Sequence, residues 1–387
     1  MSEMKNAVGA GTGRSGDDLC AGNSVCEFKI WADVLNYGKK ILKNAGIVEA
    51  DLDAWYLFEQ SFGISRAQYF LCARENIVGS TAQKMTAQEQ TGNSLESKNA
   101  LDCVELWLKE KLSAYEHALK KRAARIPLQQ IIGQQEFMGL SFFVNEHVLI
   151  PRQDTETLVE LVLQEQKDKD ISILDMCTGS GCIAVSLKKL GGYAHVEGAD
   201  ISEESLKVAK RNSEEILENN DVNNDAVSSR TEQIQNCTNL TNNQNKQDNS
   251  EERMVSEASK LSQAGVTFRH SDMFSNFPET EQFDVIVSNP PYIPSAVIEE
   301  LEPEVRDHEP RGALDGTADG LYFYRILAEE CAKHLTPGGH VYFETGYDQG
   351  AAVKELLDIH GFKDTRVIQD LAGKDRVVCG AWQTAGV

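Results

Sequence analysis

Residues 171–181 read Ile171-Ser172-Ile173-Leu174-Asp175-Met176-Cys177-Thr178-Gly179-Ser180-Gly181. The first five form a short, mostly apolar run, which is typical of a strand buried on both faces of a parallel sheet. A helical pattern follows through Ile183, Leu187 and Leu190. Glycines at a strand-to-helix turn let the backbone approach a ligand closely. The stretch therefore predicts an α/β fold with a ligand site at this turn, although such a turn alone does not identify the ligand.

Three more predicted strands each end at a polar residue: residues 194–199 at Asp200, residues 266–270 at Asp272 and residues 283–288 at Asn289. Open α/β sheets bind ligands outside the carboxyl ends of their strands, so these side chains should lie near the glycine turn. Asp200 is placed to accept hydrogen bonds from both ribose hydroxyls of a nucleoside, and Asp272 to accept one from an adenine amino group. Taken singly, either acid could instead be a solvated loop residue or a helix N-cap.

The acidic residue before the glycines helps to choose the ligand. A diphosphate needs the full Gly-x-Gly-x-x-Gly turn at a helix N-terminus, and this turn does not match it. Asp175 would repel a phosphate, whereas it could receive the cationic amino-acid end of S-adenosyl-L-methionine, directly or through water. We therefore predict S-adenosyl-L-methionine as the cofactor. Methyl transfer from its sulfonium requires no metal, because catalysis rests on positioning and electrostatics.

The four residues Asn289-Pro290-Pro291-Tyr292, here called the clamp, predict the substrate chemistry. A planar amide or aromatic amine is a poor nucleophile because its nitrogen lone pair is delocalised. The side-chain oxygen of Asn289 and the carbonyl of Pro290 can each accept one N–H, which favours the pyramidal nitrogen of the transition state. Pro291 stiffens the turn and Tyr292 offers a ring face to a planar substrate. The alternative is a plain strand-ending turn, since Asn and Pro are common turn residues.

Further motifs occur in order along the chain: Ile126-Pro127-Leu128-Gln129-Gln130-Ile131-Ile132-Gly133, Glu136-Phe137-Met138-Gly139-Leu140, Leu149-Ile150-Pro151-Arg152-Gln153-Asp154-Thr155-Glu156, Glu304-Val305-Arg306-Asp307-His308-Glu309-Pro310-Arg311, Ala313-Leu314-Asp315-Gly316, Asp319-Gly320-Leu321, Glu344-Thr345-Gly346-Tyr347-Asp348-Gln349-Gly350 and Asp370-Leu371-Ala372-Gly373-Lys374-Asp375-Arg376. With the glycine turn and the clamp, residues 27–75 and 101–382 resemble the PrmC/HemK family of protein N5-glutamine methyltransferases. That family modifies the Gln of the Gly-Gly-Gln motif in class I peptide chain release factors. The resemblance implies a Rossmann-like, seven-stranded class I S-adenosylmethionine-dependent methyltransferase domain preceded by a small N-terminal helical bundle.

The resemblance also assigns residues. The cofactor loop of the family falls on Cys177-Thr178-Gly179-Ser180-Gly181, its ribose acid on Asp200, its adenine-side pair on Asp272-Met273 and its substrate clamp on Asn289-Pro290-Pro291-Tyr292. Cys177 stands where many members carry a first glycine, so the loop must accept a small side chain there. Met273 replaces a frequent aromatic residue and keeps a polarizable contact beside the adenine.

The chain is expected to contain four parts. Residues 1–26, rich in Gly, Ser and Asp, predict a disordered tail. Residues 27–125 carry helical apolar patterns and are expected to form a bundle that, by resemblance, recognises the substrate. Residues 126–150 resemble a connector with a β-hairpin. Residues 151–387 form the predicted methyltransferase domain, interrupted by a polar, Asn-rich segment at 213–262 that predicts a flexible insertion.

Composition excludes some classes of protein. No apolar run approaches the length of about 18 residues that a membrane helix needs, and the start of the chain lacks the pattern of a signal peptide. The 9 cysteines are irregularly spaced without a Cys-x-x-Cys pair, which favours reduced thiols over disulfides or zinc. These features predict a cytoplasmic enzyme without a metal site.

Other substrates remain open at this point. A clamp of this kind also suits the adenine amino group of DNA, but 38 Lys and Arg against 60 Asp and Glu give a net charge of −22. Affinity for a phosphate backbone needs clustered cations, so no direct DNA binding is expected. A related group of enzymes methylates a glutamine of a ribosomal protein. A catalytically inactive module that only binds S-adenosyl-L-methionine is a third possibility.

Overall fold

The computed structural model describes residues 28–81, 97–218 and 265–383, with the side chains of 97–101 excepted. The tail expected at 1–26 lies outside these residues, as does most of the insertion expected at 213–262. The chain divides between Ala124 and Arg125 into two compact units.

The N-terminal unit consists of helices. Its main elements are α1 (Trp31–Asn44), α2 (Ala50–Phe62), α3 (Arg66–Cys72) and α5 (Ser97–Ala123). Aromatic rings fill its core, with Phe58 in edge contact with Trp31 and Tyr115. Asp53 and Arg122 form a buried ion pair at 2.7 Å. The helical bundle predicted from the apolar spacing is confirmed.

The second unit begins with short elements. Helix α6 (Leu128–Ile132) precedes strands β1 (Gln134–Phe137) and β2 (Leu140–Phe143), which pair as an antiparallel hairpin. A 3-10 turn, η2 (Gln153–Thr155), then leads into helix α7 (Glu156–Glu165). Asn212 ties this hairpin to the main sheet domain, because its amide bonds both the N–H and the carbonyl of Phe143.

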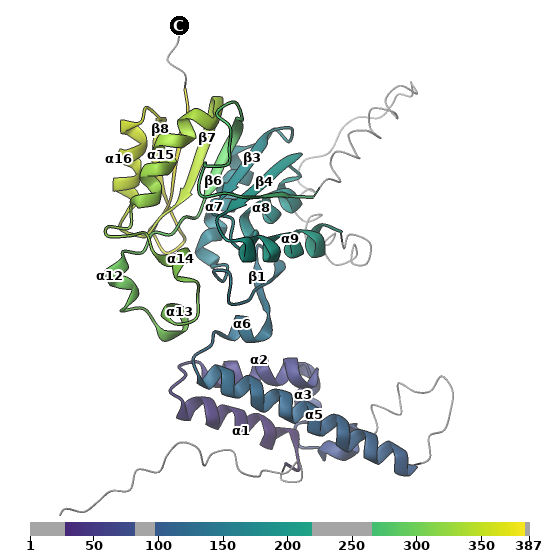
Figure 1. The fold of residues 1–387 in the computed structure, drawn as a ribbon. Helices are drawn as coiled ribbons and strands as arrows, with labels where there is room; N and C mark the ends of the chain where they lie inside the picture. The colour runs from purple at the N-terminus through teal and green to yellow at the C-terminus, as the bar shows by residue number, and fades with distance from the viewer. Residues whose placement is uncertain (1–27, 82–96, 219–264, 384–387) are drawn as a thin grey trace, which may run out of the picture. The chain divides into compact units, whose positions relative to one another are not determined.

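The core of this unit is a seven-stranded sheet in the order β5-β4-β3-β6-β7-β9-β8. Its strands are β3 (Ser172–Met176), β4 (His195–Asp200), β5 (Thr267–His270), β6 (Phe283–Ser288), β7 (Leu335–Glu344), β8 (Lys363–Gln369) and β9 (Asp375–Ala381). The first five strands in this order are parallel, and β9 runs antiparallel to both neighbours. The Rossmann-like seven-stranded fold is confirmed (Figure 1).

Helices cover both faces of the sheet. Helices α7, α8 (Cys182–Ser186, continued by the turn Leu187–Gly191) and α9 (Glu203–Glu218) lie on one face, and α15 (Tyr322–His334) and α16 (Gly350–Ile359) on the other. The alternation of strand side chains explains this arrangement. Val285 and Val287 of β6 enter the first core and Ile286 the second. Because α9 continues to Glu218, residues 213–218 of the predicted flexible insertion are helical.

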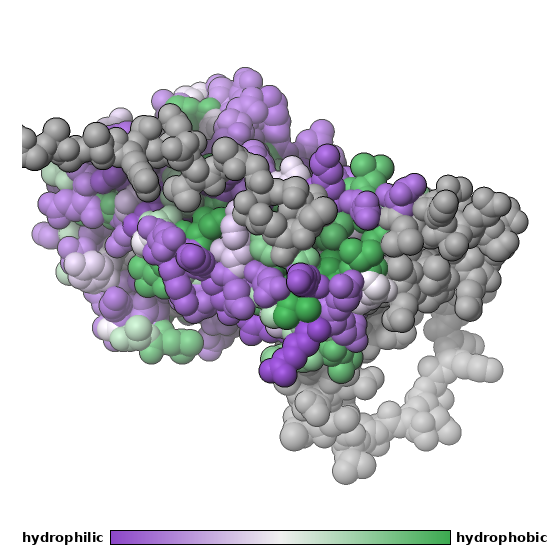
Figure 2. All heavy atoms as spheres, turned by 90° about the horizontal axis from the view of Figure 1, so that it is seen from below, coloured by the Kyte–Doolittle hydropathy of each residue, from purple (hydrophilic) through white to green (hydrophobic). Residues whose placement is uncertain are grey.

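Three short helices follow the clamp: α12 (Ser295–Ile298), α13 (Pro303–Arg306) and α14 (Arg311–Leu314). Within the described ranges, no helix combines the length and the apolar character needed to span a bilayer. On the face shown in Figure 2, hydrophobic residues occur in separate groups between hydrophilic ones.

Candidate active site

The turn between β3 and α8 forms one wall of a cavity. Thr178 N donates to Ala199 O of β4 at 2.9 Å, and Gly181 N donates to Thr178 O at 2.8 Å. Gly179 and Gly181 both have positive φ, which a residue with a side chain adopts at a cost. A Cβ on Gly181 would lie 3.0 Å from the Cβ of Ala209, so this glycine also lets α9 pack against the turn. The predicted cofactor loop is thus fixed by backbone bonds and close packing.

Asp175 supports this loop from below. It is fully buried, and its Oδ2 accepts hydrogen bonds from Thr178 Oγ1 at 2.6 Å and from Ala184 N at 3.1 Å. The second bond satisfies an N–H in the first turn of α8, as a capping side chain does. Burial raises the pKa of Asp175 to about 7, against the effect of these two bonds. Asp175 is not among the residues that line the cavity, so its carboxyl group is not exposed to a ligand bound there.

Asp200 stands at the tip of β4, in the cavity wall. Its Oδ2 accepts from Gly179 N at 2.8 Å and its Oδ1 from Ser202 N at 2.9 Å. Burial raises the pKa of Asp200, opposed by these backbone bonds. The carboxylate therefore links the cofactor loop to the start of α9, and its remaining lone pairs are available to ligand hydroxyls.

Cys177 and Met273 meet beside Asp272 in the same wall. The sulfur atoms of Cys177 and Met273 are 3.9 Å apart, and both residues have positive φ, 65° and 47°. Non-glycine residues seldom adopt this conformation. Burial raises the pKa of the Cys177 thiol, which keeps it neutral. Asp272 is exposed and lines the cavity. The two departures from the family pattern therefore contact each other.

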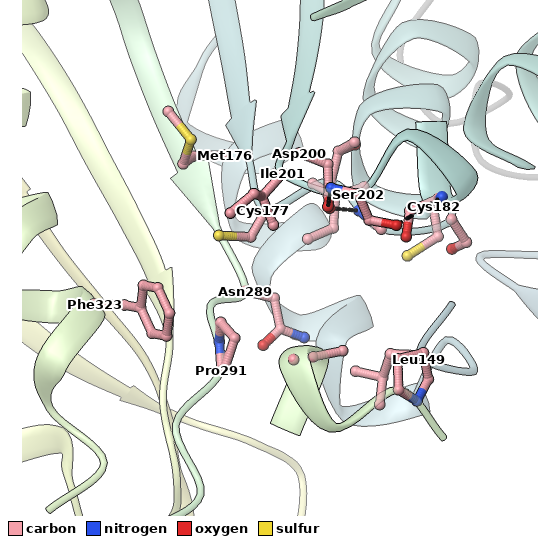
Figure 3. Close-up of a pocket in the computed structure, with 18 of the residues that line it drawn as sticks. Leu149, Met176, Cys177, Cys182, Asp200, Ile201, Ser202, Asn289, Pro291 and Phe323 are labelled. Carbon is pink, nitrogen blue, oxygen red and sulfur yellow. Dashed lines mark hydrogen bonds between the residues drawn. The ribbon is translucent and has the colours of Figure 1, made fainter. Parts of the chain in front are cut away.

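Asn289 is the first residue after β6 and faces the cavity. Its Nδ2 donates to the hydroxyl of Thr155 at 3.3 Å, which leaves its Oδ1 free to accept. In Figure 3 the oxygen of Asn289 lies on the side of Pro291 and the nitrogen on the opposite side. Among the described residues, nothing donates a hydrogen bond to the carbonyl of Pro290. Among the residues that the structure describes, the two acceptors predicted for the substrate nitrogen therefore receive no hydrogen bond.

The rest of the clamp is held from behind. Gln349 Nε2 donates to Tyr292 O at 3.0 Å, while a Cβ on Gly316 would lie 2.7 Å from Tyr292 Cα. A Cβ on Gly320 would lie 2.3 Å from Tyr292 O. Only glycine permits this approach, which gives a physical reason for the motifs at 313–316 and 319–321.

Tyr292 itself points toward a buried acid. Its hydroxyl lies 3.5 Å from Glu344 Oε1, and its ring packs against the core under α15. Tyr292 does not line the cavity, so the ring face expected from it stays a prediction. Two aromatic residues that the sequence analysis did not select, Tyr322 and Phe323, do line it. Figure 3 shows Phe323 beside Pro291.

The cavity has a volume of about 460 Å³ and joins the cofactor loop to the clamp. Its lining includes most of the predicted residues: Cys177, Thr178, Gly179, Ser180, Asp200, Asp272, Met273, Asn289 and Pro291. Residues missed by the sequence analysis include Thr155, Ile201 and Arg152. Arg152 Nη2 contacts both oxygens of the buried Glu309 at 2.7 and 2.9 Å, which fixes the segment after the clamp at the cavity edge.

A buried polar network lies behind the clamp. Glu344 is 1% exposed, and burial raises its pKa to about 7, against hydrogen bonding from Thr155 and the charge of Arg376. Arg376 bonds Asp154 at 3.0 Å and Asp370 at 3.1 Å. No cluster of three or more metal-binding side chains occurs in the part of the chain that the structure describes.

Two family models match the chain. The PrmC N-terminal domain matches residues 33–88, and the Eco57I restriction-modification methylase matches residues 194–343. The second range includes β4, β5, β6 and the clamp, but neither model matches half of the chain.

Several relatives match more of it. A release factor glutamine methyltransferase of Geobacter sulfurreducens is 38% identical over 70% of this chain and 78% of its own length. One of Caulobacter vibrioides is 33% identical over 88% of this chain and 93% of its own length. Among solved structures, the release-factor-specific protein-(glutamine-N5) methyltransferase of Alicyclobacillus acidocaldarius is 22% identical over 63% of this chain and 100% of its own, with a TM-score of 0.29.

Proposed function

The chain belongs to the family of release factor glutamine methyltransferases, and we propose that it methylates the side-chain amide nitrogen of the Gln in the Gly-Gly-Gln motif of class I peptide chain release factors. The methyl donor is S-adenosyl-L-methionine. The observation that carries the proposal is the pair of acceptors Asn289 Oδ1 and Pro290 O, which receive no hydrogen bond from the described residues and lie beside a cavity that the cofactor loop also lines.

The cavity residues fit this cofactor. Asp200 offers a carboxylate to ribose hydroxyls, while Ile201 and Met273 offer apolar surface to an adenine ring. A Cβ added to Gly179 would have no neighbouring atom of the described residues within 4 Å, so the space beside this backbone is open to a ligand. Asp200 and Asp272 make the wall acidic, which suits a cation and disfavours a phosphate. When bound, S-adenosyl-L-methionine supplies a methyl group activated by the sulfonium charge.

The clamp prepares the substrate nitrogen. Asn289 Oδ1 and Pro290 O each accept one N–H of the glutamine amide, which orients its lone pair toward the cofactor loop. Phe323 and Pro291 enclose the planar amide between apolar surfaces. The nitrogen gains positive charge as its bond to the methyl carbon forms and the carbon–sulfur bond breaks. Its N–H thereby becomes strongly acidic, so the surplus proton leaves to water and no strong base of the chain is needed.

The same proposal assigns recognition of the release factor to the helical unit and a cytoplasmic location to the protein. The match of the PrmC N-terminal domain to residues 33–88 supports a role of this unit in recognising the release factor. A release factor substrate places the enzyme in the cytoplasm, where methylation tunes translation termination.

A second candidate substrate is the amino group of adenine in DNA. The match of the Eco57I methylase to residues 194–343 favours it, because that range contains the clamp. The net charge of −22 opposes it, since binding a phosphate backbone needs clustered cations. We therefore favour a protein substrate over DNA. A ribosomal-protein glutamine would meet the clamp as the release factor does.

One experiment separates these substrates. The purified chain is incubated with methyl-labelled S-adenosyl-L-methionine and, in separate reactions, with a recombinant release factor, ribosomal proteins or duplex DNA. A release factor whose Gly-Gly-Gln glutamine is replaced by alanine serves as the matched control. We expect label on the release factor that keeps its Gly-Gly-Gln glutamine and none on the alanine control. Label confined to ribosomal proteins or to DNA, or no transfer to any substrate, would refute the proposal.

A further inference from the structure

The orientation of one side-chain amide decides whether the clamp can work. The carboxamide of Asn289 has an acceptor oxygen on one side and a donor NH2 on the other. Rotation by half a turn would present the NH2 to the substrate, so that two donors would face each other. Asn289 therefore needs a partner that holds it with Oδ1 toward the cavity.

Thr155 is the partner that the structure provides. Its Oγ1 accepts from Asn289 Nδ2 at 3.3 Å, and the residue is only 2% exposed, so water cannot readily replace it. A hydroxyl carries a single proton, and the Thr155 hydroxyl lies near enough to the Glu344 carboxyl group to lower the pKa of that group. When the Glu344 carboxyl group is ionised, it attracts the hydroxyl proton of Thr155, and Oγ1 is left to accept from Asn289. This bonding pattern is compatible with one orientation of the amide and opposes the other.

Distant segments hold Thr155 in place. The residue before it, Asp154, bonds Arg376 of β9 at 3.0 Å, and Arg376 is itself buried. The residue after it, Glu156, accepts a hydrogen bond from Met138 N in the hairpin at 2.6 Å. A hydroxyl fixed on both sides can impose an orientation on a neighbour, because its own position is not free to adjust.

We propose that Thr155 is a positioning residue that holds the carboxamide of Asn289 in the orientation required for accepting the substrate amide. The proposal rests on the proposed function and deepens it. Thr155 touches no reacting atom and acts through Asn289. It connects the motif at 149–156 with the clamp, although 134 residues separate Thr155 from Asn289.

The test compares three variants by methyl transfer to the release factor. Thr155→Val removes the hydroxyl and keeps the shape, while Thr155→Ser keeps the hydroxyl. Thr345→Val is the matched control, because Thr345 is fully buried and its hydroxyl has no hydrogen-bond partner among the described residues. We expect Thr155→Val to lower kcat about tenfold, the effect of losing one positioned hydrogen bond. Thr155→Ser and Thr345→Val should stay within about twofold of the wild type.

Two further measurements distinguish positioning from a general loss of structure. The Kd of S-adenosyl-L-methionine, by calorimetry, should be the same in Thr155→Val and the wild type. In the Asn289→Ala background, Thr155→Val should cause no further loss of kcat, because the group that it positions is gone. Thr155→Ala provides a second variant without the hydroxyl if the valine variant does not fold.

Some outcomes would overturn the proposal. These are a full rate in Thr155→Val or Thr155→Ala, an equal loss in Thr155→Ser, and an undiminished effect of Thr155→Val when Asn289 is alanine. Failure of the proposed function has a different signature, because the wild-type chain would then leave the release factor unmethylated.

Discussion

The two ends of the cavity are built in different ways. At the cofactor end, the bonding partners are close in sequence: Thr178 follows Asp175 by 3 positions, and Asp200 follows Gly179 by 21. At the clamp end, Asn289 follows Thr155 by 134 positions, and Glu344 follows Tyr292 by 52. One end thus follows from a local strand–turn–helix unit, whereas the other depends on the assembled sheet.

Each end also contains a buried carboxyl group, used differently. Asp175 bonds the loop and the first turn of α8, so it stabilises a shape that exists before any ligand binds. Glu344 lies beside the hydroxyl groups of Tyr292 and Thr155, so it supports the clamp from behind. This difference predicts that substitutions at the two ends will separate cofactor affinity from turnover.

The largest effect is expected from Asn289→Ala. Turnover of the release factor should fall about a hundredfold or more, because the transition state loses a positioned acceptor. The Kd of S-adenosyl-L-methionine should remain almost unchanged, since the cofactor end is intact. Steady-state kinetics and calorimetry measure the two quantities. Unchanged turnover would show that Asn289 is not part of the clamp, and a large rise in Kd would show that the two ends are not separable.

Asp200→Ala should have the opposite pattern. We expect it to weaken binding of S-adenosyl-L-methionine by about 1–3 kcal/mol, because ribose hydroxyls lose a charged acceptor. At saturating cofactor, turnover should recover most of its wild-type value. Asp200→Asn is the matched control, because it keeps the shape and one acceptor oxygen. Equal cofactor affinity in the wild type and Asp200→Ala, measured by calorimetry, would remove this assignment.

The buried acid behind the clamp should make stability depend on pH. Burial raises the pKa of Glu344 from 4.5 to about 7, so the folded chain retains a proton that the unfolded chain has lost between these values. The folded state binds more protons in this range, and stability therefore falls as the pH rises from about 5 to 7. The side chain of Glu344→Gln cannot titrate. The free energy of unfolding of this variant should therefore fall by about 2 kcal/mol less than that of the wild type between pH 5 and 7.

The measurement is urea unfolding of the cofactor-free protein at several pH values. Asp175→Asn is the corresponding variant at the cofactor end, since burial also raises the pKa of Asp175 to about 7. Each variant should remove part of the slope. An unchanged slope in Glu344→Gln would mean that Glu344 is ionised in the folded protein across this range, in which case the network behind the clamp is charged throughout.

The sequence predicted the sheet and the position of most cavity residues because both follow from local rules. An apolar run predicts a buried strand, and a polar residue after it lies at the ligand-binding edge. For Asp175, which was predicted to receive the ligand directly or through water, the structure shows a position beneath the loop and outside the cavity lining. The side chains of a strand alternate between its faces, and Leu174 and Met176 enter the core opposite α8, which directs Asp175 beneath that helix.

The support of the clamp could not be predicted in this way. Thr155 and Glu344 carry no local pattern that relates them to Asn289. They come together through contacts between distant segments, such as the ion pair of Asp154 with Arg376 and the hydrogen bond of Asn289 to Thr155. The position of Phe323 in the cavity wall also has no local sequence signal, because it depends on where the chain enters α15. The motifs at 149–156, 344–350 and 370–376 were recognised only by resemblance. The structure gives their physical reason, since they meet behind the clamp.

The smallest expected effect tests whether the cofactor loop stores backbone strain. Cys177 has a φ of 65°, a conformation that disfavours any residue with a Cβ by about 1–2 kcal/mol. Cys177→Gly removes this penalty together with the sulfur contact to Met273, whereas Cys177→Ala removes the contact alone. Glycine also gains freedom in the unfolded chain, which offsets part of the relief. The glycine variant should therefore be more stable than the alanine variant by about 1 kcal/mol or less in urea unfolding. If alanine were the more stable of the two, the positive φ at this position would carry no strain, and the loop would owe its shape to Asp175 and Asp200 alone.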